Sequence, residues 1–333
     1  MKAVRLHGYG GPEVLKLEDV EVPVPGPRDV LIVVRATSVN PVDWKIRSGG
    51  QRNVVHYKLP WILGLDVSGV VEAVGAQVTR FKPGDAVWSS PTYKRPGTYA
   101  EKVCVDEREV GFKPSNLTHD EAASLPLVAL TAYQCVVEKG RVERGQTVLI
   151  HAGAGGVGSF AIQLAKHLGA RVITTCSAKN ADFVKGLGAD VAVDYTTQKF
   201  EDFGPVDFVL DSLGEAALAR HAKVIRRGGR MSNITVDLPK HVEKYGPFFS
   251  LFTIAAVMIW VHLWPLLRAG IRVRHVIKRS DGDQLQQIAR LVEAGAIKPV
   301  IDRTFQLAQL AEAHRLSETH RARGKIVIHV SDG

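Results

Sequence analysis

The residues best suited to chemistry lie in one glycine-rich run, HAGAGGVG, over residues 151–158. Gly153, Gly155 and Gly158 have the spacing G-x-G-x-x-G, directly after a predicted strand and directly before a predicted helix. Glycines permit a tight turn and let the backbone approach a pyrophosphate, whose charge meets the amides of the helix N-terminus. A turn built of glycine only for close strand–helix packing is the competing interpretation. The predicted dinucleotide contacts are Gly153, Gly155, Gly156, Val157 and Gly158.

The residues that follow this turn indicate which dinucleotide it would hold. An NAD site usually carries Asp or Glu about 20 residues further on, where it accepts from a ribose hydroxyl. Here the corresponding strand leads into Ser177 and Lys179, and no carboxylate occurs before Asp182. A carboxylate would repel a 2′-phosphate, whereas Ser177, Lys179 and the hydroxyl of Tyr195 would donate to it. We therefore predict NADPH; an ordinary solvated lysine at a helix start is the alternative for Lys179.

Two kinds of element must position these residues. Residues 1–115 read as short strands separated by Gly and Pro, which is typical of a barrel-like domain. From residue 146 strands and helices alternate, which predicts a parallel, doubly wound sheet. Thr118 and Glu121 have the spacing of a capping box at the start of a helix. The predicted fold class is α/β, a β-barrel-type domain joined to a Rossmann domain.

Composition excludes several classes of protein. The 333 residues carry a formal charge of +9, but the basic residues are mostly scattered and lack interleaved aromatics, so we expect no nucleic-acid partner. Three widely spaced cysteines cannot form a disulfide framework, and we interpret them as small buried residues in a reducing compartment. The first residues already read as a strand rather than a leader segment, so we expect a cytoplasmic protein.

Several further motifs make the chain resemble the medium-chain dehydrogenase/reductase superfamily. They are Asn40-Pro41-Val42-Asp43-Trp44-Lys45-Ile46-Arg47-Ser48-Gly49, Gly64-Leu65-Asp66-Val67-Ser68-Gly69, Lys82-Pro83-Gly84-Asp85, Gly97-Thr98-Tyr99-Ala100-Glu101, Thr131-Ala132-Tyr133, Leu187-Gly188-Ala189-Asp190, Asp211-Ser212-Leu213-Gly214 and Gly324-Lys325-Ile326-Val327. Within the superfamily the chain looks most like the zinc-free quinone oxidoreductase branch. The resemblance covers essentially the whole sequence.

The resemblance implies a GroES-like catalytic domain over 1–122, completed by 295–333, and a Rossmann NADP-binding domain over 123–294. It also implies an active site in the cleft between them. Thr131, Leu213 and Lys325 are expected to contact the cofactor because they lie in family motifs. A homodimer is the expected assembly.

The chain departs from the zinc enzymes of the superfamily at the metal ligands. Asn40 stands where those enzymes have a cysteine and Leu65 where they have a histidine, and their other catalytic cysteine would fall near Leu127. None of these side chains is a usual zinc ligand. The four-cysteine structural lobe expected between Ser89 and Val103 is also missing. We therefore expect no metal.

Without a Lewis acid, hydride transfer is easiest to an acceptor that delocalises the resulting charge, such as a quinone or an α,β-unsaturated carbonyl. The predicted catalytic residues are Asn40 as a hydrogen-bond donor, Lys45 as a second donor and Asp43 as the group that holds Lys45. Their structural alternative is a helix N-terminus, with Asn40 as the cap, Pro41 in the first position and Asp43 near the dipole. An NADPH-binding protein with little turnover, acting through an interaction or membrane surface, is the alternative function.

Residues 245–267 contain no Asp, Glu, Lys or Arg and are followed by Arg268, Arg272, Arg274, Lys278 and Arg279. The length meets the criterion for a membrane span, about 20 residues, and the cations are typical of a membrane edge. A span would interrupt the predicted sheet, so a dimer surface or the entry of a lipophilic acceptor is favoured. Peripheral membrane contact is the second interpretation.

Overall fold

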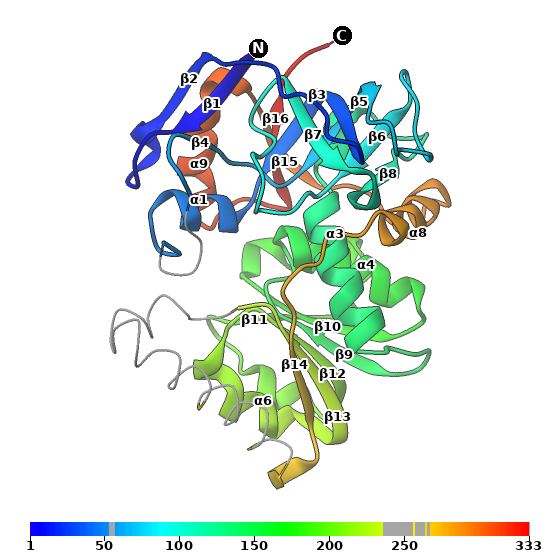
Figure 1. The fold of residues 1–333 in the computed structure, drawn as a ribbon. Coiled ribbons are helices and arrows are strands. Elements are labelled where there is room, and N and C mark those ends of the chain that lie inside the picture. Colours follow the sequence, from blue (N-terminus) through cyan, green and yellow to red (C-terminus); the bar gives the residue numbers. More distant parts are fainter. Residues whose placement is uncertain (53–56, 236–255, 257–263, 265–266, 333) are drawn as a thin grey trace. The chain divides into compact units, whose positions relative to one another are not determined.

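The computed structural model describes residues 1–52, 57–235, 256, 264 and 267–332. It divides into two compact units (Figure 1). Unit 1 comprises Met1–Leu130 and Arg279–Gly333, and unit 2 comprises Thr131–Lys278. The predicted α/β fold class, with a GroES-like domain and a parallel Rossmann-like sheet, is confirmed.

Unit 1 is built from short, mainly antiparallel strands around β3. One sheet has the order β2-β1-β4 and the other the order β15-β16-β3-β5-β6-β8, with β7 also paired to β3. Long runs of Val and Ile make β3 buried along most of its length, because it has neighbours on both edges. The strands of unit 1 are β1 Lys2–Leu6, β2 Leu15–Asp19, β3 Asp29–Val39, β4 Trp61–Ile62, β5 Val67–Val74, β6 Ala86–Ser89, β7 Lys102–Asp106, β8 Val110–Phe112, β15 Ile301–Gln306 and β16 Lys325–His329.

Helices α1 (Pro41–Arg47), α2 (His119–Ala123), α8 (Gly282–Glu293) and α9 (Leu310–Glu318) complete unit 1. The predicted capping box is confirmed, since Thr118 Oγ1 accepts from the amide of Glu121 and the Glu121 carboxylate accepts from the amide of Thr118. Helix α3 (Pro126–Tyr133) runs into a π-helical stretch, Gln134–Lys139.

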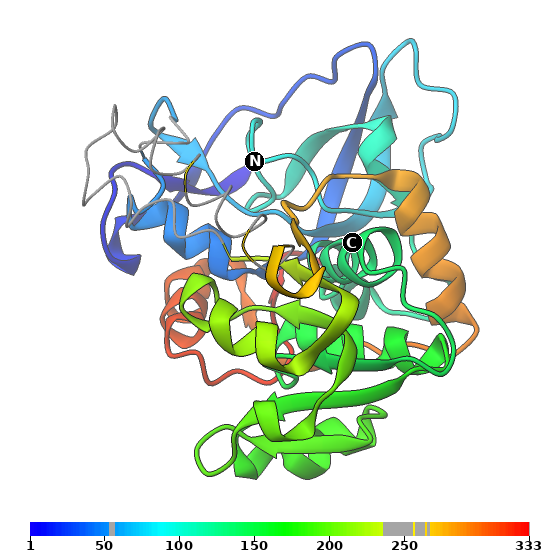
Figure 2. The same cartoon turned by 90° about the horizontal axis from the view of Figure 1, so that it is seen from below.

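The division between units differs from the predicted boundaries at 122 and 295. Helix α8, which we assigned to the cofactor domain, belongs to unit 1 (orange in Figures 1 and 2). Its Gln286 side chain accepts from the amide of Phe112, and its Glu293 carboxylate accepts from the amide of Ser115. Gly111 of β8 lies so close to Leu285 that an added Cβ would stand 3.0 Å away. These tertiary contacts decide which unit the helix covers.

Unit 2 contains a six-stranded parallel sheet of order β11-β10-β9-β12-β13-β14 (Figure 1). The chain proceeds from β9 outward to β11, then returns to the other side of β9, so the order reverses between β9 and β12. Such a reversal point is where open α/β sheets bind ligands. The elements are β9 Thr147–Ile150, α4 Gly156–His167, β10 Arg171–Cys176, α5 Ala181–Gly186, β11 Val191–Asp194, β12 Val206–Asp211, α6 Leu218–Val224, β13 Ile225–Asn233 and β14 Arg272–His275.

Almost all of the segment 245–267 lies outside the described residues, so its interpretation as a dimer, entry or membrane surface stays a prediction. Among the residues that are described, no helix is long and apolar enough to cross a bilayer.

Candidate active site

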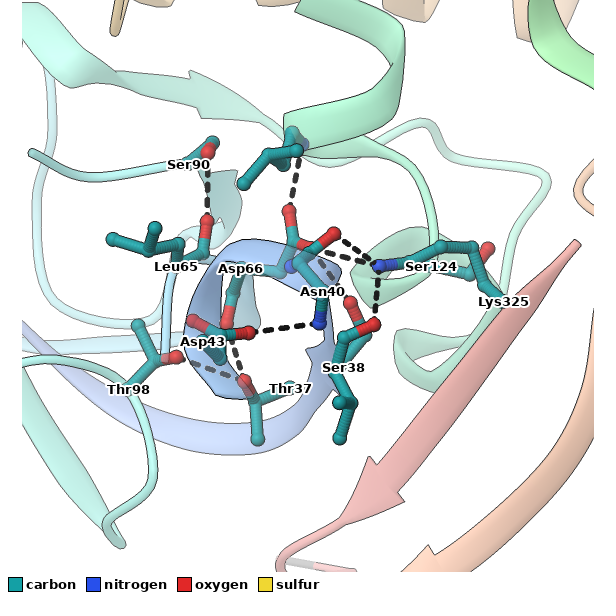
Figure 3. A network of polar contacts seen from close by, with 12 residues as sticks. Thr37, Ser38, Asn40, Asp43, Leu65, Asp66, Ser90, Thr98, Ser124 and Lys325 are labelled. Carbon is teal, nitrogen blue, oxygen red and sulfur yellow. Dashed lines mark hydrogen bonds and ion pairs between the residues drawn. The ribbon is translucent and has the colours of Figure 1, made fainter. Parts of the chain in front are cut away.

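A buried polar network occupies the end of β3 in unit 1 (Figure 3). The ammonium of Lys325 donates to Asn40 Oδ1 at 2.5 Å, to the carbonyl of Val39 at 3.0 Å and to Asp66 Oδ2 at 3.3 Å. Asn40 Nδ2 in turn donates to Asp66 Oδ2 at 2.7 Å. All three hydrogens of Lys325 therefore have acceptors, while one of the two amide hydrogens of Asn40 has no acceptor among the described residues.

Strand pairing brings these residues together. Strands β16 and β5 both run antiparallel to β3, and Ile326 pairs with Val39 while Ser68 pairs with Ala36. Lys325 begins β16 and Asp66 immediately precedes β5, so both reach the residue that follows β3, which is Asn40. Lys325, predicted as a cofactor contact, thus lies with the predicted catalytic residue Asn40.

Asp66 is a central residue that sequence reasoning missed. Its Oδ2 atom also accepts from the Ser38 hydroxyl at 2.6 Å, and its Oδ1 atom accepts from the amide of Leu127 at 2.7 Å. Asp66 is fully buried, and buried carboxylates are retained where they are paired. An acid in the otherwise apolar run Leu65-Asp66-Val67 was the available signal, but nothing local identified Lys325 as its partner.

The structural alternative for Asn40 and Asp43, a helix N-terminus, is confirmed for the Asn40 backbone and the Asp43 side chain but not for the Asn40 side chain. The Asp43 carboxylate accepts from the backbone amide of Asn40 at 2.8 Å, and Pro41 takes the first helical position. The Asn40 side chain is instead engaged by Asp66 and Lys325. Asn40 is thus the cap by backbone position, while its amide belongs to the network.

The expected contact between Asp43 and Lys45 is wrong. Residues two apart on a helix point in different directions, and here Asp43 is buried whereas Lys45 is exposed, with its ammonium 5.7 Å from the ring centre of Trp44. Lys45 can reach a ligand from solvent, but Asp43 does not hold it.

Asp43 is instead the end of a chain of donors. Its Oδ2 atom accepts from the Tyr99 hydroxyl at 2.9 Å, and His314 Nε2 lies 3.3 Å from the same hydroxyl oxygen. Arg47 Nη1 lies 3.4 Å from His314 Nδ1. A guanidinium only donates, so His314 Nδ1 accepts and its Nε2 carries the hydrogen that points to Tyr99. All four side chains are buried, and in this series of hydrogen bonds each residue donates to the next one toward Asp43.

Burial determines the pKa values of Asp43 and His314 in this hydrogen-bonded series. It raises the pKa of Asp43 to about 7, against the opposing effect of hydrogen bonds from Asn40 and Tyr99. Burial and the neighbouring Arg47 charge lower the pKa of His314 to about 3, so its imidazole is neutral. Asp43 Oδ2 accepts two donors, whereas Oδ1 is buried and has no hydrogen-bond partner within the described structure, so Oδ1 is the oxygen open to protonation.

The three positions that would carry zinc ligands converge on Asp66. It bonds the side chain of Asn40 and the amide of Leu127, and it directly follows Leu65. The side chains there are one amide and two aliphatic groups. Throughout the described ranges, no group of three or more His, Cys, Asp or Glu side chains could hold a metal ion.

The glycine-rich turn of unit 2 joins β9 to α4 as predicted. The surroundings that an added Cβ would meet differ among its glycines. A Cβ on Gly153 would stand 2.1 Å from Thr174 Oγ1, and one on Gly158 would stand 2.2 Å from the carbonyl of Ala152. Close packing therefore explains these two. A Cβ on Gly155 would meet only the Ala152 carbonyl at 3.4 Å, and the backbone of Gly155 has ordinary extended angles. Its missing side chain leaves open space at the start of α4, which fits the close approach of a pyrophosphate.

The other predicted cofactor residues of unit 2 lie at the same edge of the sheet. Cys176 pairs with Asp194, so the residues that follow them, Ser177 and Tyr195, lie side by side at the ends of β10 and β11. Lys179 and Tyr195 are exposed. Leu213, also exposed, follows the end of β12. Thr131, by contrast, is buried on α3.

A buried pair of histidines supports the turn, and sequence reasoning missed it. His151 Nε2 lies 2.9 Å from His221 Nε2, and His151 Nδ1 lies 3.1 Å from Thr175 Oγ1, which also accepts from the amide of Ala152. Burial lowers the pKa of His151 to about 3 and that of His221 to about 4, so both are neutral. Seventy residues separate the two histidines, which is why no local pattern linked them.

Comparisons with known proteins agree with this architecture. A model described as "Alcohol dehydrogenase GroES-like domain" matches residues 26–115, and one described as "Zinc-binding dehydrogenase" matches residues 187–328. The chain is 36% identical to the mouse protein "NAD(P)H oxidoreductase RTN4IP1, mitochondrial", covering 99% of this chain and 89% of that protein. It is 35% identical to "NADPH-dependent alkenal/one oxidoreductase, chloroplastic" of Arabidopsis thaliana, covering 99% and 79%.

Among solved structures, the quinone oxidoreductase from Coxiella burnetii matches with a TM-score of 0.85 and 33% identity over 99% of both chains. The mouse and Arabidopsis relatives are named as NAD(P)H and NADPH oxidoreductases and the Coxiella burnetii structure as a quinone oxidoreductase, and each match covers 99% of this chain. The chain therefore belongs to the medium-chain dehydrogenase/reductase superfamily, in its quinone oxidoreductase-like branch.

Proposed function

We propose that the protein is an NADPH-dependent reductase that transfers hydride to a quinone or an α,β-unsaturated carbonyl without a metal. The observation that carries this proposal is the buried network of Asn40, Asp66 and Lys325. At the position where zinc enzymes of the superfamily carry a cysteine, this chain has Asn40. Its amide oxygen accepts a hydrogen bond from Lys325, and its amide nitrogen donates one of its two hydrogens to Asp66. The relatives named as an alkenal/one oxidoreductase and a quinone oxidoreductase support the same acceptor classes.

The carboxyl edge of β9, β10 and β11 would hold the cofactor, which when bound supplies the hydride. The open space at Gly155 and the amides at the start of α4 suit the pyrophosphate. Ser177, Lys179 and Tyr195 would donate to the 2′-phosphate. Thr131, Leu213 and Lys325 stay predictions as cofactor contacts.

On the acceptor side, the protein's task is to position the acceptor and to stabilise charge that develops on its oxygen. The free amide hydrogen of Asn40 and the exposed ammonium of Lys45 are the donors proposed for this oxygen. Burial raises the pKa of Asp43 to about 7, so part of this carboxyl is protonated at neutral pH, beside the backbone of Asn40. Asp66 and Lys325 keep the Asn40 amide in one orientation.

The test is oxidation of NADPH by the purified protein with 9,10-phenanthrenequinone and with alkyl enones. Turnover with either acceptor class is expected, and Asn40→Ser should lower kcat by about a hundredfold if its amide donates to the developing oxyanion. Lys58→Ala, which removes an exposed lysine of unit 1, serves as the control. NADPH binding without turnover of either class would favour the alternative, a binding protein that acts through an interaction or membrane surface.

We also propose that the protein works as a homodimer in the cytoplasm. Light scattering on the purified protein should give twice the chain mass, and a monomer mass would contradict the dimer.

A further inference from the structure

Five cationic side chains line one pocket of unit 2. The pocket encloses about 240 Å³ and is lined by Glu138, Lys139, Arg141, Arg230, Arg272 and Arg274. Three segments contribute: the end of the π-helical stretch, β13 and the edge strand β14. One carboxylate stands against five cations, so the pocket is strongly positive.

Strand register explains why the arginines gather. Strand β14 pairs in parallel with β13, with Arg272 opposite Arg230 and Arg274 opposite Ser232. Side chains alternate along a strand, so these three arginines share one face of the sheet. Met231 and Val273 point to the opposite face and are buried in the core of unit 2. The alternation Arg-Val-Arg in β14 thus separates an apolar face from a cationic one.

Hydrogen bonds join the π-helical stretch Gln134–Lys139 and the residue after it to this cationic face. Arg230 Nη1 donates to the carbonyl of Gly140 at 3.0 Å, and Ser232 Oγ donates to the carbonyl of Cys135 at 3.0 Å. Arg141 follows with a φ of 47°, a left-handed conformation that side chains other than glycine adopt at a cost. Side-chain hydrogen bonds from β13 to backbone carbonyls therefore hold the end of the π-helical stretch against the cationic face of the sheet.

Among the described residues, Glu138 is the one carboxylate that lines the pocket with these cations. In the part of the chain that the structure describes, none of the five cations forms an ion pair, whereas Arg220 and Arg226 of the same unit pair with Glu201 and Asp207. Cations gathered in a concave surface repel one another and raise the local concentration of anions. Guanidinium groups in particular match the oxygens of phosphate.

We propose that this pocket binds a compact soluble anion that carries one or two phosphate groups. Its volume is below the roughly 300–1,000 Å³ of pockets for drug-sized ligands, which suits an inorganic or small organic phosphate. Strand β14 lies three strands from β9, about 14 Å at the spacing of neighbouring strands, so the site is separate from the glycine-rich turn.

Arg272 and Arg274 belong to the group of cations over 268–279 that the sequence indicates as typical of a membrane edge. Arg272 and Arg274 lie in β14 and line the pocket. A phospholipid headgroup offers the same chemistry as a free phosphate, so the experiment must separate the two sources.

Isothermal titration of inorganic pyrophosphate into the full-length protein at low ionic strength tests the proposal. The double variant R272A/R274A should weaken binding about tenfold or more, and added salt should weaken binding to the wild type. The control R144A/R227A removes the same charge from exposed arginines of unit 2 outside the pocket, and it should bind pyrophosphate within about twofold of the wild type. Gly155→Val should retain this binding, because it alters only the glycine-rich turn.

Equal weakening by both double variants would show that net charge alone attracts the anion and would overturn the proposal. Loss of binding in Gly155→Val with full binding in R272A/R274A would assign the pyrophosphate to the glycine-rich turn and would also overturn it. A second arm uses co-sedimentation with phosphatidylglycerol vesicles. Vesicle binding that needs Arg272 and Arg274, without binding of soluble pyrophosphate, would replace the soluble ligand by a membrane headgroup. None of these readouts depends on reductase activity.

Discussion

The Nζ atom of Lys325 lies 2.5 Å from the Oδ1 atom of Asn40, although 285 residues separate them in the chain. This contact closes unit 1 on itself, because β16 must pair with β3 before the two side chains can meet. The ammonium of Lys325 thus lies in a buried site. Among the hydrogen-bond acceptors of Lys325 in the described structure, Asp66 is the only carboxylate.

The first prediction concerns that buried pair. Lys325→Met should lower the free energy of unfolding by about 3–5 kcal/mol, because it leaves the Asp66 charge buried with less compensation. The double variant D66N/K325M should cost less than the sum of the single variants, since neither charge is then stranded. Denaturant unfolding measures both. Asp19→Asn, at the exposed pair of Lys2 and Asp19, is the control and should leave stability unchanged. Additive losses from the two single variants would show that Asp66 and Lys325 are not coupled.

The second prediction concerns pH. The pKa of Asp43 is raised from about 3.9 in an unfolded chain to about 7 in the folded state, so the folded protein binds more protons between these values. Its contribution to stability is therefore present below pH 4 and is lost as the pH rises to 7, by up to about 1.4 kcal/mol per pH unit. Asp43→Asn removes this dependence. The difference in unfolding free energy between wild type and variant should fall steadily from pH 4 to 7.

Other groups titrate in the same interval, which is why the difference is measured. Burial lowers the pKa of His151, His221 and His314, so these residues make the protein lose stability as the pH falls. Both proteins share that effect and it cancels. A difference that stays constant over the interval would contradict the raised pKa of Asp43.

The third prediction separates packing from ligand binding in the glycine-rich turn. Gly155→Val should fold but lose NADPH binding, because an added Cβ would meet only the Ala152 carbonyl, at 3.4 Å, whereas the side chain would stand where the pyrophosphate is expected. Gly158→Ala should instead lower stability, by about 1–3 kcal/mol, since its Cβ would stand 2.2 Å from the carbonyl of Ala152. Thermal unfolding and cofactor titration on both variants check this. Normal NADPH binding by Gly155→Val would mean that the open space is not used.

The fourth prediction is the preference for NADPH over NADH. Lys179→Ala should weaken NADPH binding about tenfold and hardly affect NADH, which lacks the 2′-phosphate, and the effect should shrink as salt rises. Adding Ser177→Asp should weaken NADPH binding further, because a carboxylate repels the phosphate. Lys223→Ala, an exposed lysine on α6, is the matched control. Equal weakening of both cofactors by Lys179→Ala would contradict the assignment.

The fifth prediction is metal independence. The side chains at the three expected ligand positions are Asn40, Leu65 and Leu127, which do not form a zinc site. Elemental analysis of the purified protein should show far less than one zinc per chain, and a chelator should leave the rate of NADPH oxidation unchanged. Stoichiometric zinc whose removal abolishes activity would overturn the prediction.

The amino-acid sequence alone determined the features that depend on neighbours in the chain. The glycine-rich turn, the capping box of Thr118 and Glu121, and strands such as β5, β10 and β11 follow from local propensity and spacing. The order of Gly153, Gly155 and Gly158 after a strand predicts the dinucleotide turn because all its parts are contiguous. The same local logic identified the backbone role of Asn40 and Pro41 at the start of α1.

Only the tertiary structure decided which distant side chains meet. Asp66 with Lys325, Asp43 with Tyr99 and His314, and Arg230 with Arg272 each depend on strand register or helix packing across long stretches of chain. The expected pairing of Asp43 with Lys45 failed for the converse reason, because closeness in sequence did not place the two side chains on one face of the helix. Burial then set the charge states, since the pKa of a carboxyl or imidazole depends on the solvent it loses when the whole chain packs around it.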